Sequence, residues 1–125
     1  MNGQARSIAL AAVLLGFSGL VLAALGRHVV DIQSQPEMQG IWQTASLIQL
    51  FHTAALLAFS ALMVTGRLAS LRWSCWLMVA GTVIFSGSLY LRVATQGEIS
   101  GFAPAGGLMM MLGWLLAGYF LARRV

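Results

Sequence analysis

The stretch from Ser7 to Gly26, SIALAAVLLGFSGLVLAALG, decides the class of fold because it contains no Asp, Glu, Lys or Arg. The hydrocarbon core of a bilayer is about 30 Å thick and takes about 20 helical residues to cross. In lipid, only a helix or a closed barrel satisfies its backbone hydrogen bonds internally. The stretch is therefore predicted to be a transmembrane helix.

Three further charge-free windows, 45–64, 73–91 and 102–122, have the same character. The whole chain is 59% hydrophobic and 8% charged, whereas a soluble protein carries about 25% charged residues. Helices of a soluble bundle would also need polar outward faces, and none of the windows has a charged face. We predict a single all-α domain over residues 1–125, an integral membrane four-helix bundle with helices at about 7–26, 45–64, 73–91 and 102–122. The alternative for the first window, a cleaved signal peptide, is disfavoured because the window exceeds the usual apolar region of about 7–15 residues.

The arginines predict the orientation of the bundle. Arg6, the 67–72 connection and Arg123 with Arg124 place five arginines on one side, against Arg27 and Arg92 on the other. Positive residues in short loops mark the cytoplasmic face, so both termini are predicted to be cytoplasmic. The formal net charge of +4 then reflects topology and contact with membrane lipids, not nucleic acid, because no basic patch interleaved with aromatics lies outside the windows.

The segment 27–44 is the longest connection between windows. Ser34, Gln35, Pro36 and Glu37 have the spacing of a capping box, which marks a helix start. This spacing predicts that the second helix begins near residue 35 and is interrupted or bent near Gly40. An irregular loop with a chance match is the alternative.

One face of the first helix carries only small residues at alternating steps of four and three. Such a seam lets helix backbones approach closely in lipid. We favour a role of this seam in packing within the bundle over a role in binding a partner protein. The alternative is that a chain rich in Ala and Gly contains such a row by chance. The seam consists of Ala5, Ala9, Ala12, Gly16, Gly19, Ala23 and Gly26.

Polar residues of the second, third and fourth helices are predicted to collect in the outer half of the bundle. Polar side chains at membrane depth are costly unless paired, and an intramembrane His is by default a functional candidate. His52 is expected to be neutral and hydrogen-bonded, because desolvation disfavours the imidazolium. The cluster is either a small pocket or a hydrogen-bond network that fixes helix register. The candidate polar cluster is His28, Trp42, Gln49, His52, Ser86, Ser88, Tyr90, Arg92 and Pro104.

Specific chemistries are poorly supported by these residues. His28, His52, Asp31 and Glu37 show no metal-ligand spacing, and His28 lies about two turns from the depth of His52, which disfavours a haem. Ser86 with His52 lacks an orienting carboxylate within the membrane. We therefore expect no catalytic residues, no metal, no cofactor and no enzyme activity. The three consecutive Met residues and the four Trp residues are predicted to serve in packing and in anchoring at the membrane interface.

Several short runs follow one another in a specific order along the chain. The runs are Leu25-Gly26-Arg27-His28, Trp42-Gln43-Thr44, Gln49-Leu50-Phe51-His52, Phe85-Ser86-Gly87-Ser88-Leu89-Tyr90, Pro104-Ala105-Gly106-Gly107 and Gly113-Trp114. In these runs the chain resembles the family known as domain of unknown function 423, small bacterial inner-membrane proteins related to eukaryotic transmembrane protein 256. The resemblance implies four helices in the inner membrane and brings no established activity. Two departures are Arg27, where the family usually has Ala, and Ile48, where it often has Tyr.

Two hypotheses for function follow from this reading. The first is a non-enzymatic accessory or structural component that associates with a larger membrane complex, through the small-residue seam or an apolar outer face. The second is binding or movement of a lipid, quinone or other small apolar molecule at the polar cluster.

Overall fold

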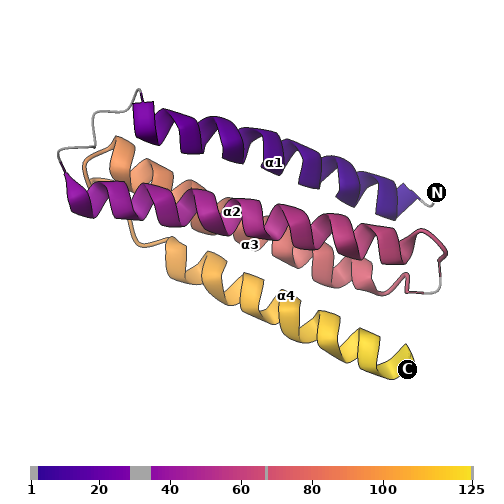
Figure 1. The fold of residues 1–125 in the computed structure, drawn as a ribbon. Helices are drawn as coiled ribbons and strands as arrows, with labels where there is room; N and C mark the ends of the chain where they lie inside the picture. The colour runs from indigo at the N-terminus through magenta and orange to yellow at the C-terminus, as the bar shows by residue number, and fades with distance from the viewer. Residues whose placement is uncertain (1–2, 29–34, 67, 125) are drawn as a thin grey trace.

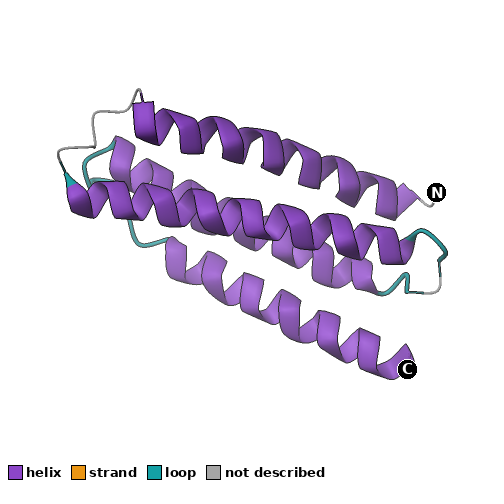
Figure 2. Ribbon diagram, viewed as in Figure 1, coloured by secondary structure: helices purple, strands orange, loops and turns teal. Residues whose placement is uncertain are grey.

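The computed structural model describes residues 3–28, 35–66 and 68–124. These residues form four long helices (Figure 1, Figure 2). The helices are α1 (Gly3–His28), α2 (Pro36–Met63), α3 (Leu71–Ala94) and α4 (Ala103–Arg124). Each is long and apolar enough to cross a membrane. The all-α, four-helix membrane architecture predicted from the sequence is therefore confirmed, with every helix extending past its charge-free window at one end or both.

The helices run alternately up and down, so that the first turn of α1 and the last turn of α4 lie at the same end (Figure 1). We call this the terminal end, and the opposite end, which holds the α3–α4 connection, the loop end. α2 and α3 form the centre of the molecule, with α1 on one flank and α4 on the other (Figure 1). The prediction that the terminal end faces the cytoplasm stays a prediction.

α2 begins as a continuous helix at Pro36 and runs through Gly40 without interruption. Its 28 residues give a length of about 42 Å. The helix therefore begins near residue 35, as the sequence predicts. Its N-cap is Gln35, whose side chain makes no capping hydrogen bond, and Ser34, on which the predicted capping box depends, lies outside the described residues. Pro36 is itself a start signal, because its fixed φ and missing N–H suit the first helical turn.

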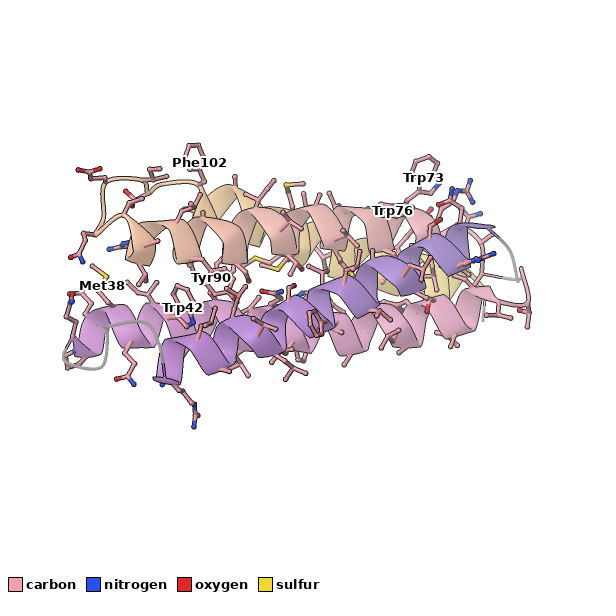
Figure 3. All side chains as sticks on the ribbon, turned by 90° about the horizontal axis from the view of Figure 1, so that it is seen from above. Met38, Trp42, Trp73, Trp76, Tyr90 and Phe102 are labelled. Carbon is pink, nitrogen blue, oxygen red and sulfur yellow. The ribbon has the colours of Figure 1, made fainter. Side chains whose placement is uncertain are left out.

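The interior is layered along the helix axes. The terminal half is an apolar core centred on Ile8, Leu56, Met63, Leu71 and Met78, all fully buried. Trp42 and Val93, with Tyr90 packed against them, form a second core near the loop end, and Figure 3 shows Trp42 and Tyr90 side by side there. Trp73 and Trp76 mark the terminal end in the same view. The buried side chains of Gln49, His52 and Ser86 form a polar layer between these two cores, while Ser60 and Ser74 are buried within the terminal one.

The small-residue seam of α1 lies against α2. A Cβ added to Gly16 would come within 2.9 Å of Thr53, and one added to Gly19 within 2.9 Å of Leu50. At Gly26 the indole of Trp42 already occupies the position that a Cβ would take. Ala5 and Ala12 are fully buried in the terminal core, while Ala9 and Ala23 are partly buried. The seam thus serves packing within the bundle.

α3 and α4 approach until their backbones touch. A Cβ at Gly81 would meet the Gly106 carbonyl oxygen at 2.8 Å, and a Cβ at Gly106 would meet the Gly81 carbonyl oxygen at 2.7 Å and the backbone of Phe85. Backbone atoms cannot swing aside as a long side chain can. Both positions therefore require glycine for the observed distance between the two helices.

We expect Gly106→Ala to lower the free energy of unfolding by about 1–3 kcal/mol, because the added methyl group forces two backbones apart. Gly118→Ala on the same helix is the matched control. Its Cβ meets nothing within 4 Å, so it should be neutral or raise stability by up to about 1 kcal/mol. Denaturant titration of both variants in detergent micelles measures the difference, and equal stabilities would refute the close contact.

Candidate functional site

The Gln49 side chain is the hub of the polar layer. Its amide nitrogen donates to the Leu15 carbonyl oxygen at 2.8 Å and to the Ser18 hydroxyl at 2.9 Å, both on α1. Its amide oxygen accepts from the Tyr90 hydroxyl of α3 at 2.8 Å. Because the Leu15 carbonyl can only accept, the orientation of the amide is fixed. One buried side chain on α2 therefore ties three helices together.

Two further hydrogen bonds between helices extend this layer toward the loop end. The Trp42 indole N–H donates to the Leu22 carbonyl oxygen at 2.6 Å, which joins α2 to α1. The Ser86 hydroxyl donates to the Ala45 carbonyl oxygen at 2.8 Å, which joins α3 to α2. Tyr90 also lies 3.2 Å from the Ser46 hydroxyl, and its ring packs edge-on against Trp42 with the ring centres 4.8 Å apart. We call these residues the three-helix network: Ser18, Trp42, Ser46, Gln49, Ser86 and Tyr90.

His52 faces the other flank of the molecule. Its Nδ1 lies 3.0 Å from the Ile48 carbonyl oxygen, and its Nε2 lies 3.0 Å from the indole nitrogen of Trp114 on α4. A carbonyl accepts and an indole N–H donates, so Nδ1 carries the proton and Nε2 is the acceptor. His52 is thus the neutral Nδ1–H tautomer, and it bridges α2 to α4.

Trp114 completes this bridge with aromatic packing. Its ring centre lies 5.6 Å from that of Phe59 and 5.9 Å from that of Phe51, both on α2. The backbones of α2 and α4 make no close approach within the described residues. Side chains centred on the His52–Trp114 bridge therefore carry the attachment of α4 to α2.

The structure brings part of the predicted polar cluster together. Trp42, Gln49, Ser86 and Tyr90 belong to the three-helix network, whereas His52 points toward α4. Ser88 donates to the Phe85 carbonyl of its own helix. Arg92 lies in the last turn of α3 and Pro104, which is exposed, in the first turn of α4, away from these bonds. The side chain of His28 lies outside the described part of the chain.

Three residues of the site escaped the sequence analysis. Ser18 and Ser46 are isolated serines within apolar windows. A single small polar residue does not change the hydrophobic periodicity of a helix, so neither stood out. Trp114 was assigned to packing and interfacial anchoring, yet its indole N–H is the partner of His52. A tryptophan in the middle of a span, where an interface cannot explain it, was the available clue.

A groove of about 300 Å³ opens between α1 and α2 at the loop end. Two members of the network, Trp42 and Ser46, form part of its wall, and His52, Ser86 and Tyr90 do not line it. This groove therefore lies at the edge of the predicted cluster and not at its centre. The remaining lining residues are Ala23, Gly26, Arg27, Gln39, Gln43, Leu47 and Leu50.

Four spanning helices tied by a buried polar layer define a small multi-pass membrane protein. Residues 22–107 match the model of the family described as protein of unknown function (DUF423). The chain belongs to this family, as the resemblance in its sequence implied.

Curated relatives agree with this assignment and with the location. The chain is 33% identical over 112 residues to the UPF0382 inner membrane protein YgdD of Escherichia coli K12, covering 89% of this chain and 86% of that protein. It is 31% identical over 109 residues to a UPF0382 membrane protein of Staphylococcus aureus, covering 83% and 88%. No solved structure matches the chain. The protein is a multi-pass protein of the bacterial inner membrane.

Two buried serines of α3 test the three-helix network. Ser86→Ala removes the bond to the Ala45 carbonyl and should lower the free energy of unfolding by about 0.6 kcal/mol, the average for hydrogen bonds between membrane helices, and by no more than about 1.7 kcal/mol. Ser74→Ala is the same change at a buried hydroxyl that has no partner in the described chain. It should be neutral or slightly stabilising, since no bond is lost. A network without energetic weight would leave both variants equal in micelle denaturation.

The His52–Trp114 bridge should be visible in the indole N–H signals of a proton–nitrogen NMR spectrum. The Trp114 indole proton, assigned through Trp114→Phe, is expected downfield because it is hydrogen-bonded, and His52→Ala should move it upfield. The exposed Trp73 indole serves as the control signal and should stay in place. An unchanged Trp114 resonance in the His52 variant contradicts the bridge.

Proposed function

We propose that this protein is a non-enzymatic membrane protein that binds a lipid or another small apolar molecule in the groove between α1 and α2. The single observation that supports the proposal is that the lining of this groove changes from polar to apolar along its length. Arg27, Gln39 and Gln43 lie toward its loop end, and Ala23, Leu47 and Leu50 lie deeper in the membrane span. Ligand sites characteristically combine apolar walls with a few polar groups.

The saturation of the three-helix network also favours the groove over the network as the place of binding. Both donor positions of the Gln49 amide are used, and the Trp42 indole N–H and the Ser86 hydroxyl each have a backbone acceptor. A ligand bound among them would have to break bonds that lipid cannot replace. The network is better suited to holding the groove wall in place.

The role of an accessory component in a larger membrane complex is the second candidate. The small-residue seam is covered by α2, so such an association would use the opposite face of α1. In its favour, α1 is the least buried of the four spans, with 17% of its most apolar window buried, against 28% to 39% for the others. Leu14 and Phe17 on that face are about 70% exposed.

Filling the groove tests the lipid-binding proposal. Ala23 lines the groove, whereas its neighbour Ala24 is exposed and does not line it. We expect native mass spectrometry of wild-type protein in mild detergent to detect bound phospholipid, Ala23→Phe to lose most of it, and Ala24→Phe to keep it. Lipid retained equally by all three proteins would overturn the proposal. A defined protein partner copurifying in place of lipid would support the accessory role.

A further inference from the structure

We propose that the groove prefers an uncharged, single-chain lipid with free hydroxyl groups on its headgroup, a monoacylglycerol, which the amides of Gln39 and Gln43 hold at the mouth of the groove. The mouth is the loop end of the groove, where these two side chains lie. The inference rests on the lipid-binding function proposed above and names the class of lipid. It requires polar groups at the mouth that a ligand can use, and space beneath them for one acyl chain.

Three polar side chains of the lining are already used within the protein. The Trp42 indole N–H donates to the Leu22 carbonyl oxygen, and the Ser46 hydroxyl donates to the Trp42 carbonyl oxygen at 3.1 Å. Arg27, the charged residue of the described lining, is also engaged in an interaction of its own within the protein. Recognition of a headgroup is therefore not assigned to any of these three side chains.

The amides of Gln39 and Gln43 are the polar groups that remain. Both side chains line the groove, and neither has a hydrogen-bond partner in the part of the chain that the structure describes. They lie four residues apart on α2, hence on one helix face and about 6 Å apart along its axis. Gln39 is half-buried and Gln43 is exposed, so a headgroup at the mouth can reach both amides.

Amides and hydroxyl groups are complementary because each of them both donates and accepts hydrogen bonds. A glutamine amide has two N–H donors and a carbonyl acceptor, and a hydroxyl group has one donor and two acceptor lone pairs. A glycerol headgroup with two hydroxyl groups can therefore donate to and accept from both amides. A quinone, a carboxylate or a phosphodiester offers acceptors only, and would leave both amide oxygens without a donor.

The deeper part of the groove fits one acyl chain. Gln43 is followed along the α2 side of the groove by Leu47 and Leu50, and Ala23 contributes to the α1 side. From Gln39 to Leu50 the helix rises about 16 Å. The volume of about 300 Å³ is at the lower limit of the range of about 300–1,000 Å³ that is usual for ligand pockets. The space suits a headgroup and the upper part of one chain.

The small volume thus favours a monoacylglycerol over a lipid with two chains. Phospholipids of the bilayer can follow the same path with one of their chains, but a charged headgroup gains nothing specific from two neutral amides. The inference therefore concerns the preference among lipids, and this preference can be measured with ligands that differ only in the headgroup.

The test compares three ligands with the same oleoyl chain, 1-monooleoylglycerol, methyl oleate and oleate, by native mass spectrometry of the full-length protein in mild detergent. Wild-type protein should retain monooleoylglycerol about tenfold over methyl oleate, equal to about 1.4 kcal/mol. Oleate, whose carboxylate only accepts, should be retained less well than monooleoylglycerol. Stronger retention of oleate would show a site for an anion and overturn the inference.

Substitutions of the two amides assign the preference to the mouth. Gln43→Leu, at an exposed position where folding is not at risk, should reduce the preference for monooleoylglycerol to about threefold, because one set of hydrogen bonds is lost. Gln39→Leu should act in the same way. Thr44→Val is the matched control, because Thr44 is the exposed polar neighbour of Gln43 and does not line the groove. A tenfold preference that survives both glutamine variants overturns the assignment.

The outcomes separate this inference from the function on which it rests. Equal retention of monooleoylglycerol and methyl oleate by wild-type protein, with Ala23→Phe losing both, overturns the hydroxyl-selective mouth and leaves lipid binding in the groove intact. Retention of none of the three ligands by wild-type protein overturns both.

Discussion

The absence of water within a bilayer is the constraint on which this structure depends. A polar group at membrane depth is costly unless it finds a partner in the protein. Gln49 answers this requirement most fully, since its amide bonds to two groups of α1 and one of α3. These bonds are directional, whereas apolar contacts between helices in lipid are not. The amide therefore fixes the relative depth of three helices that apolar packing alone would leave free to slide.

Close packing at small residues and directional hydrogen bonds together hold α1 and α4 on the two flanks of the molecule. On the α1 flank, small residues bring α1 close enough for Gln49 and Trp42 to reach its carbonyl groups. On the α4 flank, Gly81 and Gly106 set the distance to α3, and the side chain of Trp114 spans to α2. The same principle, close backbones plus a few directional bonds, thus holds both outer helices with different residues.

Much of the fold could be predicted from the sequence because few structures are stable across a bilayer. A window of about 20 uncharged residues has few choices other than a spanning helix, which is why all four helices could be predicted. The start of α2 near residue 35 was predicted from the run Ser34 to Glu37, in which Pro36 is itself a helix start signal. The division of the polar cluster was beyond reach, since helical spacing shows which residues of one helix share a face but not which neighbour that face meets. His52 and Gln49 lie three residues apart, yet they serve opposite flanks.

The distribution of Gln49's partners along the chain bears on how the protein is made. The chain is synthesised from the N-terminus. The nitrogen of this amide is satisfied by α1, which is synthesised before α2, so the first two helices can pair without leaving this donor unsatisfied. The amide oxygen is then available to accept the hydrogen bond from Tyr90 once α3 has been synthesised. In both of these contacts the hydrogen-bond donor belongs to the helix that is synthesised later, and its acceptor belongs to a helix that is already present.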